Sequence, residues 1–353
     1  MLPGLPRYLY VQLGWLSGLR STEVGQLGGT GGPVDDADGF ADLFSLNDTT
    51  IIALPWKTTE ASVWALDLHG RVKWRAGRKG SGPGEFERPY SISPLPADSI
   101  AVYDQALARV SIIDRNGKVG RSFRGPAGAV SFVSLGGTSG IAVGRFGRNA
   151  SGGAMGALPM HAIKQDSVVR SFGELQRDID PRDPFQFDRV LVPFRGGVVA
   201  VSRANQLVVE HWTREGKLVS RYVREPAWFP VAKRFVVGST EEPPSPLVQD
   251  AWIDRDERLW LLITRAAPTW KDAFSAEPMR TEGGGARRRI TRPELYYEGV
   301  VEVIDLRRGE LVVSEKVPFQ PSYAIGRGLI GVKQKTKDGD PFLSLLRMEL
   351  INK

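Results

Sequence analysis

Aspartates gather in two short segments of this sequence, and carboxylate oxygens are the ligands that calcium prefers in proteins. Residues 35–39 read DDADG and residues 178–183 read DIDPRD. The candidate metal ligands are Asp36, Asp38, Asp180 and Asp183. Neither segment has the spacing of an EF-hand loop, and in the first no glutamate closes the loop. Turn formation, in which aspartate is common, explains both segments more simply, so we predict no obligatory cofactor and keep calcium as the alternative.

Other catalytic chemistry has little support in the sequence. The chain contains no cysteine, so it has no disulfide, no thiolate zinc site and no cysteine nucleophile. It also lacks a G-x-S-x-G nucleophile elbow and a phosphate loop that ends in Gly-Lys-Ser/Thr. His69, His161 and His211 fall at an expected turn or on expected outer strands, so we expect no histidine metal centre.

Arginines form the densest charge cluster of the chain, which carries a net charge of +7. Residues 285–292 read GARRRITR and lie within a polar insertion that runs from about 266 to 295. Arginine beside aromatic side chains can bind acidic groups through charge-assisted hydrogen bonds, although a solvated loop that aids solubility is the simpler interpretation. The candidate partner-binding residues are Arg287, Arg288, Arg289, Arg292, Trp270 and, from a separate loop, Trp228. Because the cluster is single and local, we do not predict nucleic-acid binding.

The elements that must position these side chains are clearest in residues 77–123, which contain one complete set of strand and turn signals. A glycine-rich loop at 80–86 rules out a helix at the start of this unit. The expected strands are 90–93, 99–103, 109–113 and 118–123. An Asn-Gly pair between the last two predicts a hairpin turn. We expect Phe86 to be wedged between this unit and its neighbour.

The glycine of that hairpin recurs along the chain. Gly70, Gly117, Gly216 and Gly309 each separate two apolar segments. The first two lie about fifty residues apart and the later intervals are about twice as long, which fits a repeat in which some turns lack the glycine. Six units then cover the chain, and the sixth ends one strand short. Residues 22–27 resemble the outer strand of the first unit and can supply the missing strand.

This pattern predicts an all-β fold, a closed six-bladed β-propeller with four antiparallel strands in each blade. The N-terminal strand completes the last blade, which closes the ring and protects its edges. We expect residues 21–353 to form one domain and residues 1–20 to be an N-terminal extension or a degenerate signal segment. No apolar run approaches about eighteen residues, so we expect no membrane span. The tryptophans expected in the core between blades are Trp56, Trp64, Trp74, Trp252 and Trp260.

One unit carries a family resemblance. The residues that carry it are Gly80, Gly82, Pro83, Gly84, Glu85, Phe86, Pro89, Ile100, Val102, Asp104, Arg109, Val110, Asp114 and Gly117. Over these residues the unit resembles an NHL repeat, and the chain resembles the six-bladed NHL-type β-propeller proteins of bacteria. The resemblance favours an extracytoplasmic location, because the resembling proteins are mostly exported. Some of them are lyases that use channel histidines with a metal, and this chain offers no matching set.

These features together favour a non-catalytic binding or scaffolding module. We expect it to be a monomer that recognises a protein, a peptide or a small polar ligand at one face. Loops on a rigid ring commonly hold such sites, and here the insertion and the loops 178–188 and 224–246 would shape the face. The alternative is a calcium- or zinc-dependent hydrolase, lactonase or lyase with its site at the central channel.

Overall fold

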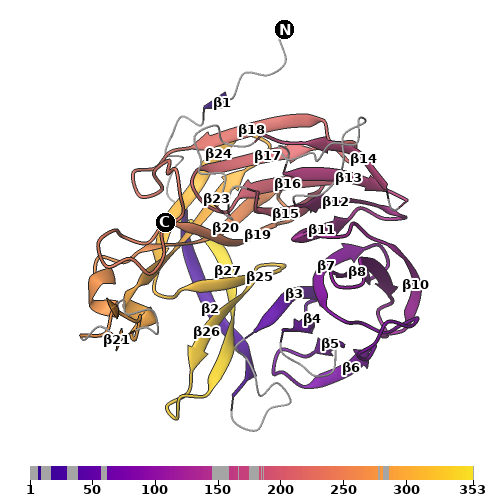
Figure 1. Ribbon diagram of the computed structural model, residues 1–353, viewed down its shortest axis with the longest axis horizontal. Helices are drawn as coiled ribbons and strands as arrows, with labels where there is room; N and C mark the ends of the chain where they lie inside the picture. The colour runs from indigo at the N-terminus through magenta and orange to yellow at the C-terminus, as the bar shows by residue number, and fades with distance from the viewer. Residues whose placement is uncertain are drawn as a thin grey trace.

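The computed structural model describes residues 7–8, 17–29, 39–56, 62–144, 159–165, 167–174, 183, 185, 187–276, 279–280 and 286–352. In this part of the chain, six four-stranded antiparallel sheets stand around a central axis (Figure 1). This arrangement is a six-bladed β-propeller, and it confirms the predicted fold class. Within the same residues, no helix has the length and hydrophobicity needed to cross a membrane.

The blades follow one another along the chain, each from its inner to its outer strand. Blade 1 contains β3 (Phe40–Asn47), β4 (Thr50–Pro55), β5 (Val63–Leu66) and β6 (Val72–Ala76). Blade 2 contains β7 (Pro89–Leu95), β8 (Ser99–Asp104), β9 (Arg109–Ile113) and β10 (Val119–Arg124). Blade 3 contains β11 (Ser131–Ser134), β12 (Ser139–Val143), β13 (Met160–Lys164) and β14 (Ser167–Phe172).

The other three blades include the two ends of the described chain. Blade 4 contains β15 (Arg189–Phe194), β16 (Gly197–Ser202), β17 (Leu207–Trp212) and β18 (Leu218–Arg224), and β1 (Arg7–Tyr8) pairs parallel with β18. Blade 5 contains β19 (Leu247–Ile253), β20 (Arg258–Ala266), β23 (Tyr297–Asp305) and β24 (Glu310–Val317). Blade 6 contains β25 (Pro321–Gly326), β26 (Leu329–Lys335), β27 (Pro341–Asn352) and β2 (Ser17–Gly28).

The ring closes in blade 6, where β2 and β27 lie side by side (Figure 1). The two strands pair antiparallel from Ser17 opposite Asn352 to Gly28 opposite Phe342. This pairing confirms the closure predicted from residues 22–27. β2 begins at Ser17, inside the segment that the sequence pattern assigned to an extension.

The hairpin glycines that marked the repeat all have a left-handed backbone. The φ angles of Gly70, Gly117, Gly216 and Gly309 are 76°, 84°, 72° and 70°. The turn at Gly117 is reinforced because Asp114 Oδ1 accepts hydrogen bonds from the backbone N–H groups of Asn116 and Lys118, both at 2.9 Å. A Cβ added to Gly117 would lie 2.7 Å from the Trp74 ring of blade 1. Backbone conformation and blade packing therefore both favour glycine there.

Apolar side chains fill the space between adjacent blades. Phe86 is fully buried among residues of blades 1 and 2, as predicted. Trp252 and Trp260 stack with ring centroids 4.9 Å apart in the core shared by blades 5 and 6, and Trp64 is buried in blade 1. The prediction for Trp56 was wrong: this residue directly follows β4, beyond the covered part of the strand, and is 52% exposed.

The insertion between β20 and β23 lies at the periphery of the ring (Figure 1). It contains the short helices η2 (Trp270–Ala273) and η3 (Pro293–Leu295) and the hairpin of β21 (Met279–Arg280) with β22 (Ala286–Arg287). A small buried cluster of Ala273, Phe274 and Tyr296 holds the insertion together. The insertion is thus anchored by apolar packing of its own.

Candidate ligand site in the central channel

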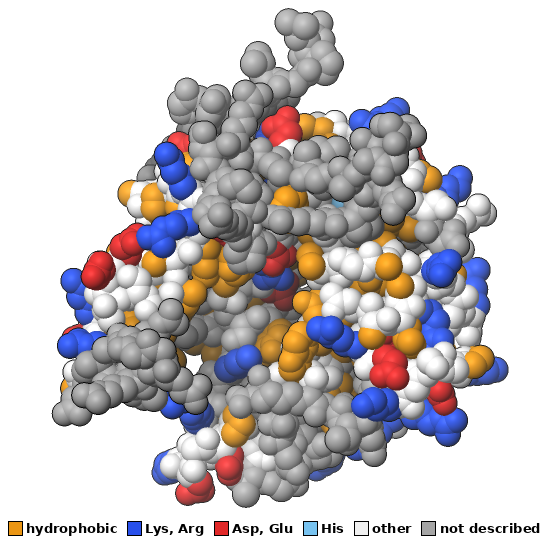
Figure 2. Space-filling model, viewed as in Figure 1, with side chains coloured by type: hydrophobic (Ala, Val, Ile, Leu, Met, Phe, Trp, Pro, Cys, Tyr) orange, Lys and Arg blue, Asp and Glu red, His pale blue; other side chains and the backbone are white. Residues whose placement is uncertain are grey.

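The inner strands β3, β7, β11, β15, β19 and β25 surround a central cavity of about 440 Å³. Figure 2, viewed along the same axis, shows a hollow over the ring centre with acidic and basic side chains inside it. In a propeller the inner strands all begin at the same face, which we call the top face, and end at the opposite bottom face. The charged residues described next lie on the first halves of inner strands or at turns of the top face.

Two aspartates of the channel link neighbouring blades. Asp42 of β3 accepts hydrogen bonds from the backbone N–H of Leu43 at 2.8 Å and from that of Ile92, on the inner strand of blade 2, at 2.7 Å. Asp250 of β19 accepts from Ala251 and, on the inner strand of blade 6, from Ala324, both at 2.8 Å. The same contact therefore joins blade 1 to blade 2 and blade 5 to blade 6.

An ion pair from blade 4 completes the charged group. Arg203, in the turn after β16, lies with its Nε 3.1 Å from an oxygen of Asp188, directly before β15. Arg203 Nη1 also donates to the carbonyl oxygens of Gln249 at 2.6 Å and Val248 at 3.2 Å, which lie on β19. The guanidinium is therefore fixed between blades 4 and 5 and faces the channel with Asp188.

The enclosure of Asp42 and Asp250 changes the pKa values of these two carboxyl groups. Burial raises the pKa of Asp42 to about 7, against the opposing effect of its backbone hydrogen bonds, and the charge of Asp250 raises it further. Burial likewise raises the pKa of Asp250, while the Ala324 hydrogen bond and the charge of Arg203 lower it. Both carboxyl groups touch the channel, but the surrounding protein removes most of their water. Near neutral pH, Asp42 is therefore divided between its protonated and ionised forms.

Two aromatic side chains lie beside the charged group at the top face. Tyr90, at the start of β7, lines the cavity, and burial followed by the charge of Asp188 raises its pKa. Trp56 does not itself line the cavity; its ring lies 5.8 Å from that of Tyr90, and it is the most exposed tryptophan among those whose side chains are described. Exposed aromatic rings next to carboxylates are typical of sites that bind polar ligands with one flat face.

Of the four predicted metal ligands, the structure describes Asp183. Asp183 is buried, and its two oxygens accept hydrogen bonds from Phe185 N, Asn205 Nδ2 and Phe235 N at 2.8, 3.1 and 2.6 Å. Asp36, Asp38 and Asp180 lie outside the described residues. Among the residues that are described, no three histidine, aspartate or glutamate side chains are grouped as a metal site requires. Calcium binding by these four aspartates stays a prediction.

The predicted partner-binding residues lie away from the channel cavity. Arg288, Arg289 and Arg292 are exposed on the peripheral insertion, and Arg292 donates to the carbonyl of Asp272. Trp270 packs edge-on to Phe274, with ring centroids 6.3 Å apart. Arg287 belongs to β22, and its side chain lies outside the described atoms.

Trp228 comes from the 224–246 loop, outside the insertion. It is half-buried against the core between blades 4 and 5, and the guanidinium of Arg265 lies 5.4 Å from its ring centroid. Among the predicted residues whose side chains are described, none lines the channel cavity. Recognition of a partner by these arginines and the two tryptophans stays a prediction.

The three segments expected to shape one face do contact one another. Phe235 of the 224–246 loop donates to Asp183, and the backbone N–H of Gly238 in the same loop donates to Tyr296 Oη at the base of the insertion, at 2.7 Å. These segments connect strands at the top face, which is also where the charged group of the channel lies.

Sequence reasoning did not single out Asp42, Arg203 or Asp250. A usable signal was present, because Asp42 in FADLFSL and Asp250 in LVQDAWI are the only acidic residues in the six inner strands. A carboxylate at such a position must find hydrogen-bond donors in the folded protein. Their convergence with Arg203 depends on the ring and has no counterpart in the local sequence.

Comparisons with known proteins agree on the fold. No family model matches the sequence, and no curated protein matches it. A structure of a DUF4221 family member from Bacteroides vulgatus is 10% identical, with 95% of this chain and 99% of that chain covered and a TM-score of 0.57. A candidate exported protein from Bacteroides fragilis is 10% identical, covers 95% of this chain and 96% of its own, and has a TM-score of 0.55.

More remote propellers include enzymes. Virginiamycin B lyase from Staphylococcus aureus is 11% identical over 95% of this chain and all of its own, with a TM-score of 0.44. At these identities the similarity shows the fold alone. The NHL-repeat type, the binding role and the extracytoplasmic location stay predictions.

Proposed function

We propose that this propeller is a binding module that recognises a small polar ligand at the top end of its central channel. One observation carries the proposal: Asp42, Asp188, Arg203 and Asp250 come from three different blades and meet around a cavity of about 440 Å³. Carboxyl groups with a raised pKa that line a cavity, as Asp42 and Asp250 do, are characteristic of functional sites, and the volume is within the range of small-molecule pockets.

The linking of blades does not by itself require charge. Ser93 of blade 2 accepts a hydrogen bond from Ser134 N of blade 3 at 2.8 Å, which is the same kind of contact made by a neutral hydroxyl. A hydroxyl group avoids the desolvation cost of an enclosed carboxylate. Asp42 and Asp250 therefore place more charge at the channel than the contact between blades needs, and this supports a role in recognition.

The composition of the site indicates the chemistry of the ligand. Three carboxyl groups and three guanidinium groups, those of Arg189, Arg203 and Arg327, line the cavity, and the carboxyl groups favour a polar ligand that donates hydrogen bonds. Trp56 and Tyr90 would contact an apolar face of that ligand. Small sugars and primary amines share these properties, and both classes are suitable probes.

Thermal unfolding with a panel of monosaccharides, disaccharides and primary amines tests the proposal, because a ligand that binds the folded state raises its unfolding temperature. We expect Trp56→Ala and Asp188→Asn to weaken the response about tenfold in ligand concentration. Trp270→Ala is the matched control, since it removes a half-buried tryptophan from the insertion. If Trp270→Ala abolished the ligand-induced rise in unfolding temperature and Trp56→Ala did not, the ligand would bind at the insertion and not at the channel.

The second candidate function is the metal-dependent hydrolase or lyase. It is favoured by one feature of the site, because a carboxyl group with a pKa of about 7 can transfer protons near neutral pH. Titration with calcium and with zinc, followed by thermal unfolding, separates the two candidates. A rise in unfolding temperature that is lost in Asp250→Asn would support the enzyme, and an unchanged temperature would support the binding module.

A further inference from the structure

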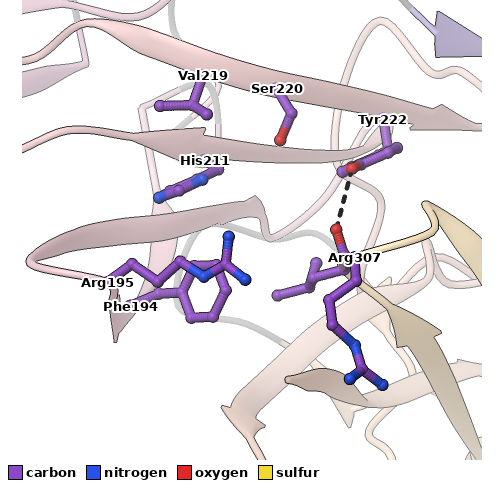
Figure 3. A pocket seen from close by; sticks show the side chains of 8 residues that line it. Phe194, Arg195, His211, Val219, Ser220, Tyr222 and Arg307 are labelled. Carbon is purple, nitrogen blue, oxygen red and sulfur yellow. Dashed lines mark hydrogen bonds between the residues drawn. The ribbon is translucent and has the colours of Figure 1, made fainter. Parts of the chain in front are cut away.

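A second cavity lies between blades 4 and 5, far from the top-face residues of the channel. It has a volume of about 280 Å³ and opens between the bottom-face turns of the two blades. Its lining residues are Phe194, Arg195, His211, Val219, Ser220, Tyr222, Leu306 and Arg307. Figure 3 shows these side chains, which come from β15, the turn after it, β17 and β18 of blade 4 and from the turn after β23 of blade 5; the Arg307 side chain extends away from that of Arg195.

The charged side chains that line this cavity are all basic. Arg195 is held in place by Glu257 of blade 5, with Nε donating to Oε1 at 2.8 Å and Nη2 to Oε2 at 2.5 Å. Arg307 is 53% exposed, and its nearest carboxylate, that of Asp305, is 3.6 Å away. Neither acid lines the cavity. An anion that entered would meet no lining carboxylate; Arg195 would offer it the donors that Glu257 does not use, and Arg307 would turn its exposed side chain toward the cavity.

Two further polar groups face the cavity with hydrogen-bonding capacity to spare. His211 of β17 and Ser220 of β18 are cross-strand partners. Within the described part of the chain, neither side chain makes a hydrogen bond to protein, and both are partly accessible. Burial and the charge of Arg195 lower the pKa of His211, so its imidazole is neutral at pH 7 and can donate one hydrogen bond.

The walls of the cavity are apolar and partly aromatic. Phe194 lies edge-on to His211 with ring centroids 5.0 Å apart. Tyr222, which also lines the cavity, donates a hydrogen bond from its hydroxyl group to Leu306 O at 3.3 Å (Figure 3). Val219, which also lines the cavity, is 56% exposed. A flat apolar group would cover these surfaces while an attached anionic group reached the arginines.

We propose that this pocket between blades 4 and 5 binds a small aromatic carboxylate, with the carboxylate between Arg195 and Arg307 and the ring against Phe194 and Tyr222. His211 and Ser220 donate hydrogen bonds to the bound anion. The site is separate from the channel and, unlike the channel, has no lining carboxylate, so its ligand differs from the donor-rich ligand proposed for the channel.

Benzoate is the probe for this pocket, and benzamide is its neutral counterpart. The histidine ring signals of the full chain are followed by NMR during titration, and His211→Asn identifies which signal belongs to His211. We expect benzoate at up to about 10 mM to shift the His211 signal in a saturable manner, and benzamide to bind about tenfold more weakly. A His211 signal that benzoate leaves unmoved, or that moves equally with benzamide, would overturn the proposal.

Arginine variants locate the anion. Arg307→Gln should weaken benzoate binding about tenfold, because one charge-assisted contact is lost. Arg121→Gln is the matched control, since it removes the same charge from an exposed position of β10 in blade 2. Equal affinities of these two variants would show that overall charge, and not this pocket, attracts the anion, and the assignment would then be wrong.

Discussion

The stability of the protein should depend on pH through Asp42 in an unusual direction. Its carboxyl group has a pKa of about 7 in the folded protein and 3.8 as the ordinary value. Between these values the folded chain binds more protons than the unfolded chain, so the free energy of unfolding falls as pH rises. At about 1.36 kcal/mol per pH unit, the full effect is about 4 kcal/mol above pH 7, and water in the channel will reduce it.

Asp42→Asn separates this charge effect from the hydrogen bonds. The amide keeps one oxygen acceptor but presents an NH₂ group to the second backbone donor, which costs about 1 kcal/mol at every pH. We expect the variant to be less stable than the wild type by about that amount near pH 4 and more stable by about 2–3 kcal/mol near pH 8. Urea unfolding of both proteins across this range measures the difference.

Ser93→Ala provides the control for this experiment. It removes the neutral contact between blades 2 and 3, so its destabilisation should be the same at every pH. The same measurement compares the free energies of unfolding of Asp42→Asn and wild type. If their difference also stayed constant within about 0.5 kcal/mol from pH 4 to pH 8, the enclosed carboxylate would not destabilise the folded state, and the argument would be refuted.

Three further predictions concern the packing between blades. Arg224 and Glu302 form a buried ion pair at 2.7 Å, so Glu302→Gln should lower the free energy of unfolding by about 3–5 kcal/mol, and the double variant Arg224→Met/Glu302→Leu should recover most of it in urea unfolding. Gly117→Ala forces a Cβ against an indole ring at 2.7 Å and should lower the unfolding temperature more than Gly128→Ala, where φ is also positive but the space is open. Phe86→Ala should cost about 3–5 kcal/mol in chemical unfolding, because it leaves a cavity between two blades; a loss below about 1 kcal/mol would show that the blades can close over it.

The ring could be predicted from the sequence because its turns obey local rules. Gly117 adopts a positive φ next to an aspartate that accepts two backbone hydrogen bonds, and both residues are visible as a short motif. The repetition of that glycine sets the spacing of the blades. The position of β2 could be inferred as well, because a propeller one strand short has to find that strand elsewhere in the chain.

The channel site could not be predicted in the same way. Asp42, Arg203 and Asp250 are far apart in sequence and meet only because three blades present them to one axis. Trp56 was assigned to the core because apolar residues precede it, but the strand ends at Pro55 and the indole emerges at the top face. Strand periodicity predicts the side of a sheet on which a residue lies. It does not predict where the strand ends, and a residue beyond the end of the strand is not packed between blades.

The pairing of β2 with β27 also governs how the protein is made. β2 precedes the strands of the other five blades along the chain and β27 follows them, so the sixth sheet cannot form until those five blades have been synthesised. Joining strands so distant in sequence carries a large loop-closure entropy, which slows folding. A circular permutant that links β27 to β2 and begins between blades 2 and 3 would build every sheet from strands that follow one another in the chain. We expect it to refold faster, because the pairing of β2 with β27 would then close only a short loop.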